Sequence, residues 1–397
     1  MYSFIVNPNS RSGEGRNVWN RLRSIMESQG ISYQYFLTEY VGHATVLAEK
    51  ISAAGTPEDP VTLVTVGGDG TIYEVLTGIR DLSSVIFGFI PVGSGNDFCR
   101  SMGLPFDPFE ALHSILENRR TISMDVPVIH LGSHSYRFGI SAGMGYDAAV
   151  CQEVLITPGK KFLNRLHMGK LIYLMVALKQ FLFLTPSSVT VTFDGSEPQT
   201  FGKTWFVAVM NQKYEGGGFK FCPDASPDDG LLDVIVIEGI SKLKMPFCLP
   251  GALWGKHTHL RGVHISQCKN VHITSDRPLP VHKDGESGGI QREFSVTIEK
   301  KPLKIPYHRQ NVSLVLLLLT AALFIPIRGG FSVSTMNLSK VYFSQNQRIN
   351  HAAINPAFSF MYSATHQNNF DKQYRLMDPK KADELFTQII EKPASAT

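Results

Sequence analysis

The first 125 residues alternate between two patterns of apolar positions. Short, almost continuous apolar runs at residues 2–6, 61–66 and 85–92 predict buried β-strands. Between these runs, apolar residues recur three or four positions apart, which predicts helices with one apolar face. The residues with this spacing are Val18, Leu22, Ile25 and Met26 in one helix, and Ala44, Leu47, Ala48 and Ile51 in the next. Because apolar strands that alternate with helices are typical of parallel sheets covered on both faces, residues 1–125 predict a doubly wound α/β domain.

Residues 126–307 show a different pattern, in which short β-type runs follow one another with turns between them. The runs cover residues 189–193, 205–210, 231–237, 271–274 and 293–298. They predict a second, mostly antiparallel domain. One helical stretch at residues 171–184 interrupts them. Lys179 and Gln180 make this stretch too polar for a membrane span, so we predict a packed core helix.

A third zone begins near residue 308. Residues 312–327 are almost wholly apolar between Arg309 and Arg328, which favours a membrane helix over a buried one because no globular partner is evident. Residues 331–397 are rich in Asn, Gln and Ser and predict little core. One helix is expected there, with Asp378 as N-cap, Pro379 in its first turn, and Leu385, Phe386, Ile389 and Ile390 on one face. We therefore divide the chain into residues 1–125, 126–307, 308–330 and 331–397.

The composition narrows the class of protein. A length of 397 residues allows two or more domains with ample cores, and a net charge of +4 carries no nucleic-acid signature. The five cysteines are scattered without CxxC pairs, which disfavours a disulfide framework or a zinc cluster and suits a reducing compartment. We expect no signal peptide before the first strand, since Tyr2–Val6 already has the pattern of a core strand.

Three glycine-rich loops each follow a predicted strand, at residues 7–13, 67–71 and 91–97. The carboxyl ends of parallel strands meet at one edge of a sheet, so these loops are expected to converge there. A strand, a glycine turn and a helix N-terminus can hold phosphate, because glycine lets the backbone approach and the helix presents free amides. Asp69 would repel phosphate unless a divalent cation lies between them. The loops predict a nucleotide-using enzyme, with an ordinary strand-to-helix turn as the alternative.

Further acidic residues are candidates for the same site. Asp97 lies on the third loop and Asp125 at the domain boundary, so both could lie near the metal. Asp284 and Glu286 flank a glycine before the last strands, and such a pair could accept a proton from an acceptor hydroxyl. The alternative for this pair is a plain turn, because Asp-Gly is first of all a turn dipeptide.

Three other segments have two readings each. The acidic loop at residues 223–231 suits Mg²⁺ or Ca²⁺, but on sequence alone a solvated turn is favoured. His264, His272 and His282 form no zinc signature and are predicted to lie on polar strand faces. The basic and apolar residues at 160–166 fit either docking on an anionic bilayer or a surface helix with extended lysines.

Six motifs occur in a fixed order along the chain. They are Asn7-Pro8, Gly67-Gly68-Asp69-Gly70-Thr71, Pro91-Val92-Gly93-Ser94-Gly95-Asn96-Asp97, Gly216-Gly217-Gly218, the acidic loop 223–231 and Asp284-Gly285-Glu286. In this order they resemble the bacterial diacylglycerol kinase-like lipid kinases, from residue 1 to about 307. The resemblance implies an ATP-binding α/β domain, a β-sandwich domain for the lipid substrate and a cleft between them. It also implies a last strand near residues 300–307 that returns to the first domain.

The resemblance implies roles for single residues. Glu286 would be the proton acceptor, with Asp69, Asp97, Asp125 and Asp284 in the metal and phosphate network. The residues implied around ATP are Asn7, Pro8, Asn9, Ser10, Arg11, Thr38, Gly67, Gly68, Asp69, Gly70, Thr71, Ile72, Tyr73 and Ser94. Asp229, with the backbone carbonyls of Ser226 and Leu231, would hold a structural Mg²⁺. Tyr73 and Ser94 stand where Asn and Thr are frequent in the family, so the nucleotide contacts near Tyr73 stay open.

The tail is similar to a second family. Its motifs are Arg328-Gly329-Gly330, Asn337-Leu338-Ser339-Lys340-Val341-Tyr342-Phe343-Ser344 and Asn350-His351-Ala352-Ala353-Ile354-Asn355-Pro356. They resemble the connector after the last membrane helix in sulfatase-fold phosphoglycerol transferases, relatives of lipoteichoic acid synthase. The catalytic domain of those enzymes would lie beyond residue 397, so this tail is not expected to perform their reaction. A natural fusion, a truncated bifunctional enzyme and a gene-joining error all stay open.

The resemblance of residues 1–307 implies an ATP- and Mg²⁺-dependent lipid kinase. The favoured acceptor is diacylglycerol, and the product is then phosphatidic acid. The alternatives are an NAD kinase and a membrane-tethered nucleotide-binding protein without catalysis. The expected partners are ATP and a lipid at a membrane surface, with no nucleic acid and with a homodimer left open. The kinase domains are expected at the cytoplasmic face of the membrane, anchored by residues 312–327.

Overall fold

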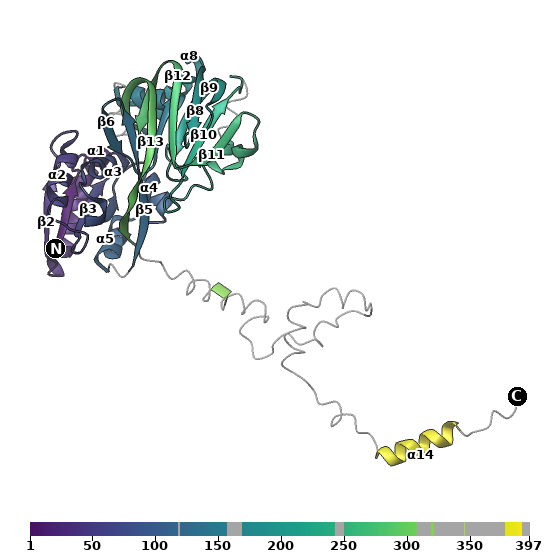
Figure 1. Cartoon of the computed structure of the whole chain (residues 1–397). Coiled ribbons are helices and arrows are strands. Elements are labelled where there is room, and N and C mark those ends of the chain that lie inside the picture. The colour runs from purple at the N-terminus through teal and green to yellow at the C-terminus, as the bar shows by residue number, and fades with distance from the viewer. Residues whose placement is uncertain are drawn as a thin grey trace. The chain divides into compact units, whose positions relative to one another are not determined.

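The computed structural model describes residues 1–117, 120–156, 169–242, 250–307, 319–320, 345 and 378–390. The chain divides into two compact units, Met1–His308 and Arg309–Thr397 (Figure 1). The first unit contains both the α/β part and the β-rich part.

Parallel strands in the order β2-β1-β3-β4 form the sheet of the first domain (Figure 1). The strands are β1 (Tyr2–Val6), β2 (Tyr33–Leu37), β3 (Val61–Gly67) and β4 (Val85–Pro91). The helices are α1 (Ser10–Ser28), α2 (His43–Ser52), α3 (Asp69–Gly78), the 3₁₀ turn η1 (Leu82–Ser84), α4 (Asp97–Met102) and α5 (Pro108–Glu117).

Successive side chains of these strands point to opposite faces of the sheet and build two cores. Ile5 and Leu63 are fully buried in the core that α2 and α3 cover. Phe4 and Val64, each next to one of these residues in sequence, are fully buried in the core that α1 and α5 cover. This double cover explains the near-continuous apolar runs and confirms the predicted doubly wound α/β domain.

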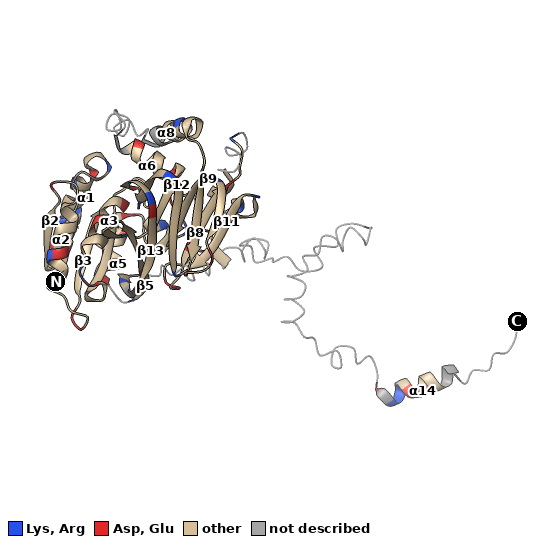
Figure 2. Ribbon diagram, turned by 45° about the horizontal axis from the view of Figure 1, so that its top comes forward, with Lys and Arg blue, Asp and Glu red and all other residues tan. Residues whose placement is uncertain are grey.

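The second domain is antiparallel and β-sandwich-like, as predicted. Its strands are β5 (Thr121–Leu131), β6 (His134–Arg137), β7 (Ser141–Gly145), β8 (Ser187–Phe193), β9 (Gln199–Met210), β10 (Leu232–Glu238), β11 (Val263–Cys268), β12 (Asn270–Lys283) and β13 (Glu286–Pro306). Strand β12 pairs with β7, β8 and β13, and β9 pairs with β7, β8 and β10. Helices α6 (Tyr146–Ile156) and α8 (Gly169–Phe183) pack on each other outside the strands, and η2 (Lys256–His259) precedes β11 (Figure 2).

Strand β13 belongs to both domains. Its first half pairs with β12, its second half pairs with β5, and Lys304 pairs with Ile86 of β4 in parallel. Arg137 of β6 adds a side-chain link, because its guanidinium pairs with Glu299 of β13 at 2.6 Å and donates to the carbonyl of Ile79 after α3. The first and second domains are therefore joined by backbone pairing and not only by a linker.

In the second unit, the residues that the structure describes include helix α14 (Pro379–Ile390). The amide of Lys380 donates to Oδ1 of Asp378 at 2.9 Å, which confirms Asp378 as the N-cap. The predicted membrane helix at residues 312–327 lies outside the described residues except for positions 319–320, as do the connector-like motifs of the tail. Among the helices that the structure does describe, none is long and apolar enough to cross a bilayer.

Candidate active site

The three glycine-rich loops lie side by side at the carboxyl ends of β1, β3 and β4. Nδ2 of Asn7 donates to Oγ1 of Thr71 at 3.1 Å, which joins the first loop to the second. The amide of Val92 donates to the carbonyl of Gly67 at 2.6 Å, which joins the second loop to the third. A β-carbon on Gly93 would lie only 2.8 Å from Cα of Gly68, so glycine is required where these backbones touch. The predicted convergence of the loops is present in the fold.

The first loop has a backbone that few residues adopt. Arg11, Ser12 and Gly13 have φ values of 46°, 60° and 100°, so the regular turns of α1 begin after them. Three consecutive left-handed residues, two of them with side chains, form a strained segment of the kind found at ligand sites. Asn9 precedes them, and its amide donates to Oδ1 of Asn7 at 3.0 Å. Pro8 and Ser10 are buried beside this turn.

Asp69 begins α3, and its carboxylate accepts hydrogen bonds from the amides of Asp97 (3.3 Å) and Phe98 (3.4 Å) at the start of α4. Burial and, to a smaller extent, the nearby Asp97 carboxylate raise the pKa of Asp69 to about 7, although the two amides oppose the shift. Asp97 is itself buried and accepts from the amide of Gly217 at 2.6 Å, with Nε of Arg100 at 3.5 Å. Burial is also the main cause that raises the pKa of Asp97. A half-buried carboxylate, Asp69, and a buried one, Asp97, therefore flank one small region.

The turn that carries Glu286 reaches the second glycine loop. Asp284 and Gly285 have φ values of 49° and 80° and join β12 to β13 as a two-residue hairpin of the type that needs two positive φ values. A β-carbon built on Gly70 would lie 2.8 Å from Oε1 of Glu286. The Glu286 carboxylate therefore lies directly against the second glycine loop, residues 67–71, although Glu286 comes from the other domain.

Asp284 fastens this turn to β7. Its carboxylate accepts hydrogen bonds from the amides of Gly139 (2.6 Å), Ile140 (2.8 Å) and Ser141 (2.9 Å). Burial raises the pKa of Asp284 to about 6, and these amides oppose the shift by stabilising the charged form. These three hydrogen bonds hold the turn that carries Glu286 against the start of β7.

Lys283 lies between two aromatic rings next to the same turn. Its ammonium is 4.5 Å from the ring centre of Tyr73 on α3 and 4.4 Å from that of Tyr136 on β6. Burial lowers the pKa of Lys283, and the carboxylates of Glu286 and Asp284 partly offset this. The buried Tyr73 ring therefore contacts Lys283 through a cation–π interaction.

Lys283→Met is expected to move the acidic limb of the pH profile of kcat/KM to higher pH by about one unit. The ammonium favours the ionised form of nearby carboxylates, so its loss makes a base beside it ionise less readily. The measurement is kcat/KM against pH, with Lys283→Arg as the matched variant that keeps the charge and the ring contacts. An unchanged profile in Lys283→Met would remove any electrostatic role for this residue.

The remaining predicted residues fall into two groups. Thr38 follows β2 and donates its amide to the carbonyl of Val6 at 2.8 Å, and Ser94 is exposed on the third loop. Both lie at the same sheet edge as the glycine loops. Ile72 differs, because its side chain is buried in the core under α3, so only its backbone could face a nucleotide.

Asp125 lies with the acidic loop and not in hydrogen-bond contact with Asp69 or Asp97. Its Oδ2 accepts from the amide of Gly230 at 2.8 Å, and its own amide donates to the carbonyl of Pro227 at 2.6 Å. Burial raises the pKa of Asp125, and the Asp229 and Asp228 carboxylates add to the shift. Within the loop, Oδ1 of Asp229 accepts from the amide of Leu231 at 2.9 Å, and Ser226 donates to Asp228 at 2.6 Å. Asp125 therefore belongs to the loop predicted to hold a structural cation.

Both predicted cation sites have suitable donors. Around Gly95, the Asp69 and Asp97 carboxylates lie close enough to repel each other, and Oδ1 of Asn96 is buried without a hydrogen-bond partner among the described residues. In the acidic loop, three carboxylates converge on the same turn. Oxygen donors with surplus negative charge are the ligands that Mg²⁺ prefers, so the residues fit this ion at both places.

One buried cluster was not predicted. His282 is fully buried, and its Nε2 lies 3.0 Å from Oδ2 of Asp147 and 3.3 Å from Oε1 of Glu215, so the prediction of a polar strand face for His282 is wrong. These three donor atoms lie within 4.8 Å of one another, as in a metal site. Burial disfavours the charged form of His282, but the Glu215 and Asp147 carboxylates outweigh it and raise the pKa of His282 to about 9. The amide nitrogen of Gly285 lies 3.4 Å from Nδ1 of the same ring. The cluster therefore lies directly behind the turn that carries Glu286.

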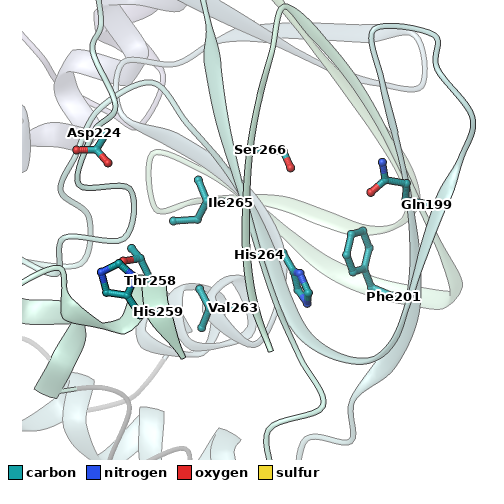
Figure 3. Close-up of a pocket in the computed structure, with 9 residues that line it drawn as sticks. All are labelled: Gln199, Phe201, Asp224, Thr258, His259, Val263, His264, Ile265 and Ser266. Atoms are coloured by element: carbon teal, nitrogen blue, oxygen red, sulfur yellow. The ribbon is translucent and has the colours of Figure 1, made fainter. Parts of the chain in front are cut away.

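A separate pocket of about 510 Å³ lies beside the edge strand β11 and contains none of the predicted catalytic residues (Figure 3). His264 in this pocket lies 3.1 Å from Glu238, and its ring centre is 5.3 Å from that of Phe201. Partly exposed His264 and His272 agree with the predicted polar strand faces.

Comparisons with known proteins agree with this arrangement. The family described as "Diacylglycerol kinase catalytic domain" matches residues 1–127, and the "YegS C-terminal NAD kinase beta sandwich-like domain" matches residues 141–305. The Bacillus subtilis protein named "Putative lipid kinase YtlR" is 29% identical over 310 residues, which cover 76% of this chain and 98% of that protein. A diacylglycerol kinase of Staphylococcus aureus is 27% identical over 286 residues, covering 72% of this chain and 85% of the relative.

The fold has a solved counterpart. The crystal structure of "a putative diacylglycerol kinase" from Bacillus anthracis superposes with a TM-score of 0.60 at 21% identity, covering 78% of this chain and 95% of that chain. With both domains matched in order, and with the glycine loops and the Glu286 turn brought together, the chain belongs to the lipid kinase family that joins a diacylglycerol kinase catalytic domain to a YegS-type C-terminal domain.

Proposed function

We propose that this lipid kinase transfers the terminal phosphate of ATP to the free hydroxyl of diacylglycerol and so produces phosphatidic acid. The observation that carries the proposal is the contact between Glu286 and Gly70, which brings a carboxylate of the second domain to the phosphate loop of the first. Diacylglycerol is the acceptor named for the Staphylococcus aureus relatives. The proposal extends that acceptor to this chain.

In this proposal the loops of the first domain bind the triphosphate through backbone amides at the starts of α1, α3 and α4. Mg²⁺ held near Asp69 and Asp97 would neutralise charge on the phosphates. Glu286 accepts the proton of the lipid hydroxyl. The oxygen of that hydroxyl attacks the terminal phosphorus of ATP, and ADP leaves. Asp284, His282 and Lys283 hold Glu286 in place and shape its electrostatic surroundings.

The acceptor is tested with labelled ATP, Mg²⁺ and two candidate substrates, diacylglycerol in mixed vesicles and NAD in solution. We expect label in a lipid product with the mass of phosphatidic acid and none in NADP. Transfer to NAD would replace this proposal with an NAD kinase. ATP binding without transfer to any lipid offered would favour a nucleotide-binding protein that does not catalyse.

We also propose that the acidic loop holds a structural Mg²⁺ through Asp229 and the backbone carbonyls of Ser226 and Leu231. Asp229→Ala is then expected to lose the rise in Tm, about 2 °C or more, that Mg²⁺ produces in the absence of ATP. Asp59→Ala is the control, because it removes an exposed carboxylate that lies outside the acidic loop. An equal Mg²⁺ response in wild type and Asp229→Ala would contradict the site.

A further inference from the structure

Helix α8 presents an apolar face to solvent. Met175, Leu178, Leu182 and Phe183 are 61%, 57%, 57% and 77% exposed, and they define what we call the α8 face. The spacing of three, four and one residues places them on one side of the helix. The opposite side carries Val176 and Phe181, which are buried. The prediction of a packed core helix is therefore correct for one side only.

From this face we propose that α8 docks on a bilayer that contains anionic lipids and so brings the embedded acceptor to the Glu286 turn. The proposal rests on the proposed function for its substrate, but the docking itself does not require turnover. Four large apolar side chains clustered on one helix face are unusual on a protein surface in water, where such patches mark contact sites.

The charges of residues 154–193 indicate that the α8 face binds an anionic bilayer. Residues 154–193 contain no Asp or Glu, whereas they contain Lys160, Lys161, Arg165, Lys170 and Lys179. Among the described side chains, Lys179 pairs with Glu153, which lies just before this stretch. An apolar helix face in a stretch of surplus positive charge is complementary to anionic lipid headgroups above an apolar layer.

Hydrogen bonds connect α8, through α6, to the strands of the candidate active site. The Tyr146 hydroxyl of α6 donates to the carbonyl of Ala177 in α8 at 2.8 Å. Gln152, also on α6, donates to the carbonyls of Val281 and Gly289 at 3.3 and 2.9 Å, on the two strands that flank the Glu286 turn. Ile290, the next residue, is 56% exposed and adds an apolar side chain near this turn. Docking through α8 would thus hold the catalytic turn at the lipid surface.

The direct test places a tryptophan on the face of the full-length protein. Leu182→Trp is mixed with vesicles of phosphatidylcholine and phosphatidylglycerol whose acyl chains carry bromine, which quenches an inserted indole. Val46→Trp on α2, replacing a side chain that is 54% exposed, is the control. We expect quenching at position 182 at least twofold stronger than at position 46, and weaker quenching without phosphatidylglycerol. Equal quenching at both positions overturns the proposal, as does a tryptophan at position 182 that is already shielded before vesicles are added.

The functional arm uses Leu178→Asp combined with Leu182→Asp. We expect at least a tenfold loss of kcat/KM on long-chain diacylglycerol in the same vesicles and less than a twofold change on a short-chain diacylglycerol dissolved as monomers. Equal losses on both substrates would mean a structural defect and would contradict the docking role. If the wild type phosphorylates neither lipid, the proposed function fails, and the quenching result alone decides the docking proposal.

Discussion

Glu286→Gln is expected to lower kcat for phosphoryl transfer by about 10²–10⁴, because an amide of the same shape cannot accept the proton of the acceptor hydroxyl. ATP binding should change little, since the glycine loops that hold the phosphates are untouched. The measurement is kcat with diacylglycerol together with the Kd for ATP. Glu286 is the better candidate for the proton acceptor because its carboxylate contacts Gly70 of the second glycine loop. The carboxylate of Asp284, by contrast, is held by three backbone amides.

The matched control is Glu293→Gln on the same strand. The Glu293 side chain is 68% exposed and lies 3.8 Å from His272, so its neutralisation should leave kcat within a factor of two. If Glu286→Gln retains wild-type turnover while the control behaves as expected, another group accepts the proton, and the role given to Glu286 is wrong.

Asp69→Asn should lower kcat by about 10²–10³. The variant should stay folded and, at pH 8 without Mg²⁺, should be at least as stable as the wild type. The loss of activity follows from removing a carboxylate that would hold the ion on the phosphates. The effect on stability follows from the pKa of Asp69, which burial and Asp97 raise from 3.8 to about 7. Ionising this group in the folded protein therefore costs roughly 4 kcal/mol at a pH above both values.

The sign of the pH dependence is set by which state holds the proton. Between pH 4 and about 7 the folded protein retains the Asp69 proton that the unfolded chain has lost, so this group lowers stability as pH rises. Asparagine does not ionise, so the stability of the variant lacks this pH dependence. The difference in Tm between Asp69→Asn and wild type should therefore increase from pH 5 to pH 8, with exposed Asp59→Asn as control. A variant that is inactive because it unfolds, or that is fully active, would contradict this account.

Much of the fold could be predicted from the pattern of apolar residues. The strands of the first domain are buried on both faces, and for that reason they appear as short continuous apolar runs such as residues 61–66. The loops that follow them had to converge, because the carboxyl ends of parallel strands share one edge. Asp378 could be predicted as an N-cap because the signal is local: an Asp directly before Pro379.

The residues that were missed depend on contacts between distant parts of the chain. His282 lies on a strand with a polar appearance, and only folding brings Asp147 and Glu215 to its ring. The motif that contains Tyr73 predicts that this residue lies at the nucleotide, yet its ring contacts Lys283, more than 200 positions away. No spacing in the sequence reports such pairs. Ile72 shows the converse case, because a motif residue whose backbone lies at the loop has a side chain in the core.

The passage of β13 from one domain into the other limits how the protein can be divided. The match to the catalytic domain family ends at residue 127, but the neighbour of β4 on its outer side comes from residue 304. A fragment cut after the catalytic match would leave β4 with a bare edge, open to pairing with strands of other molecules. The sheet of the first domain is therefore complete only after β13, residues 286–306, has been synthesised and has paired with β4.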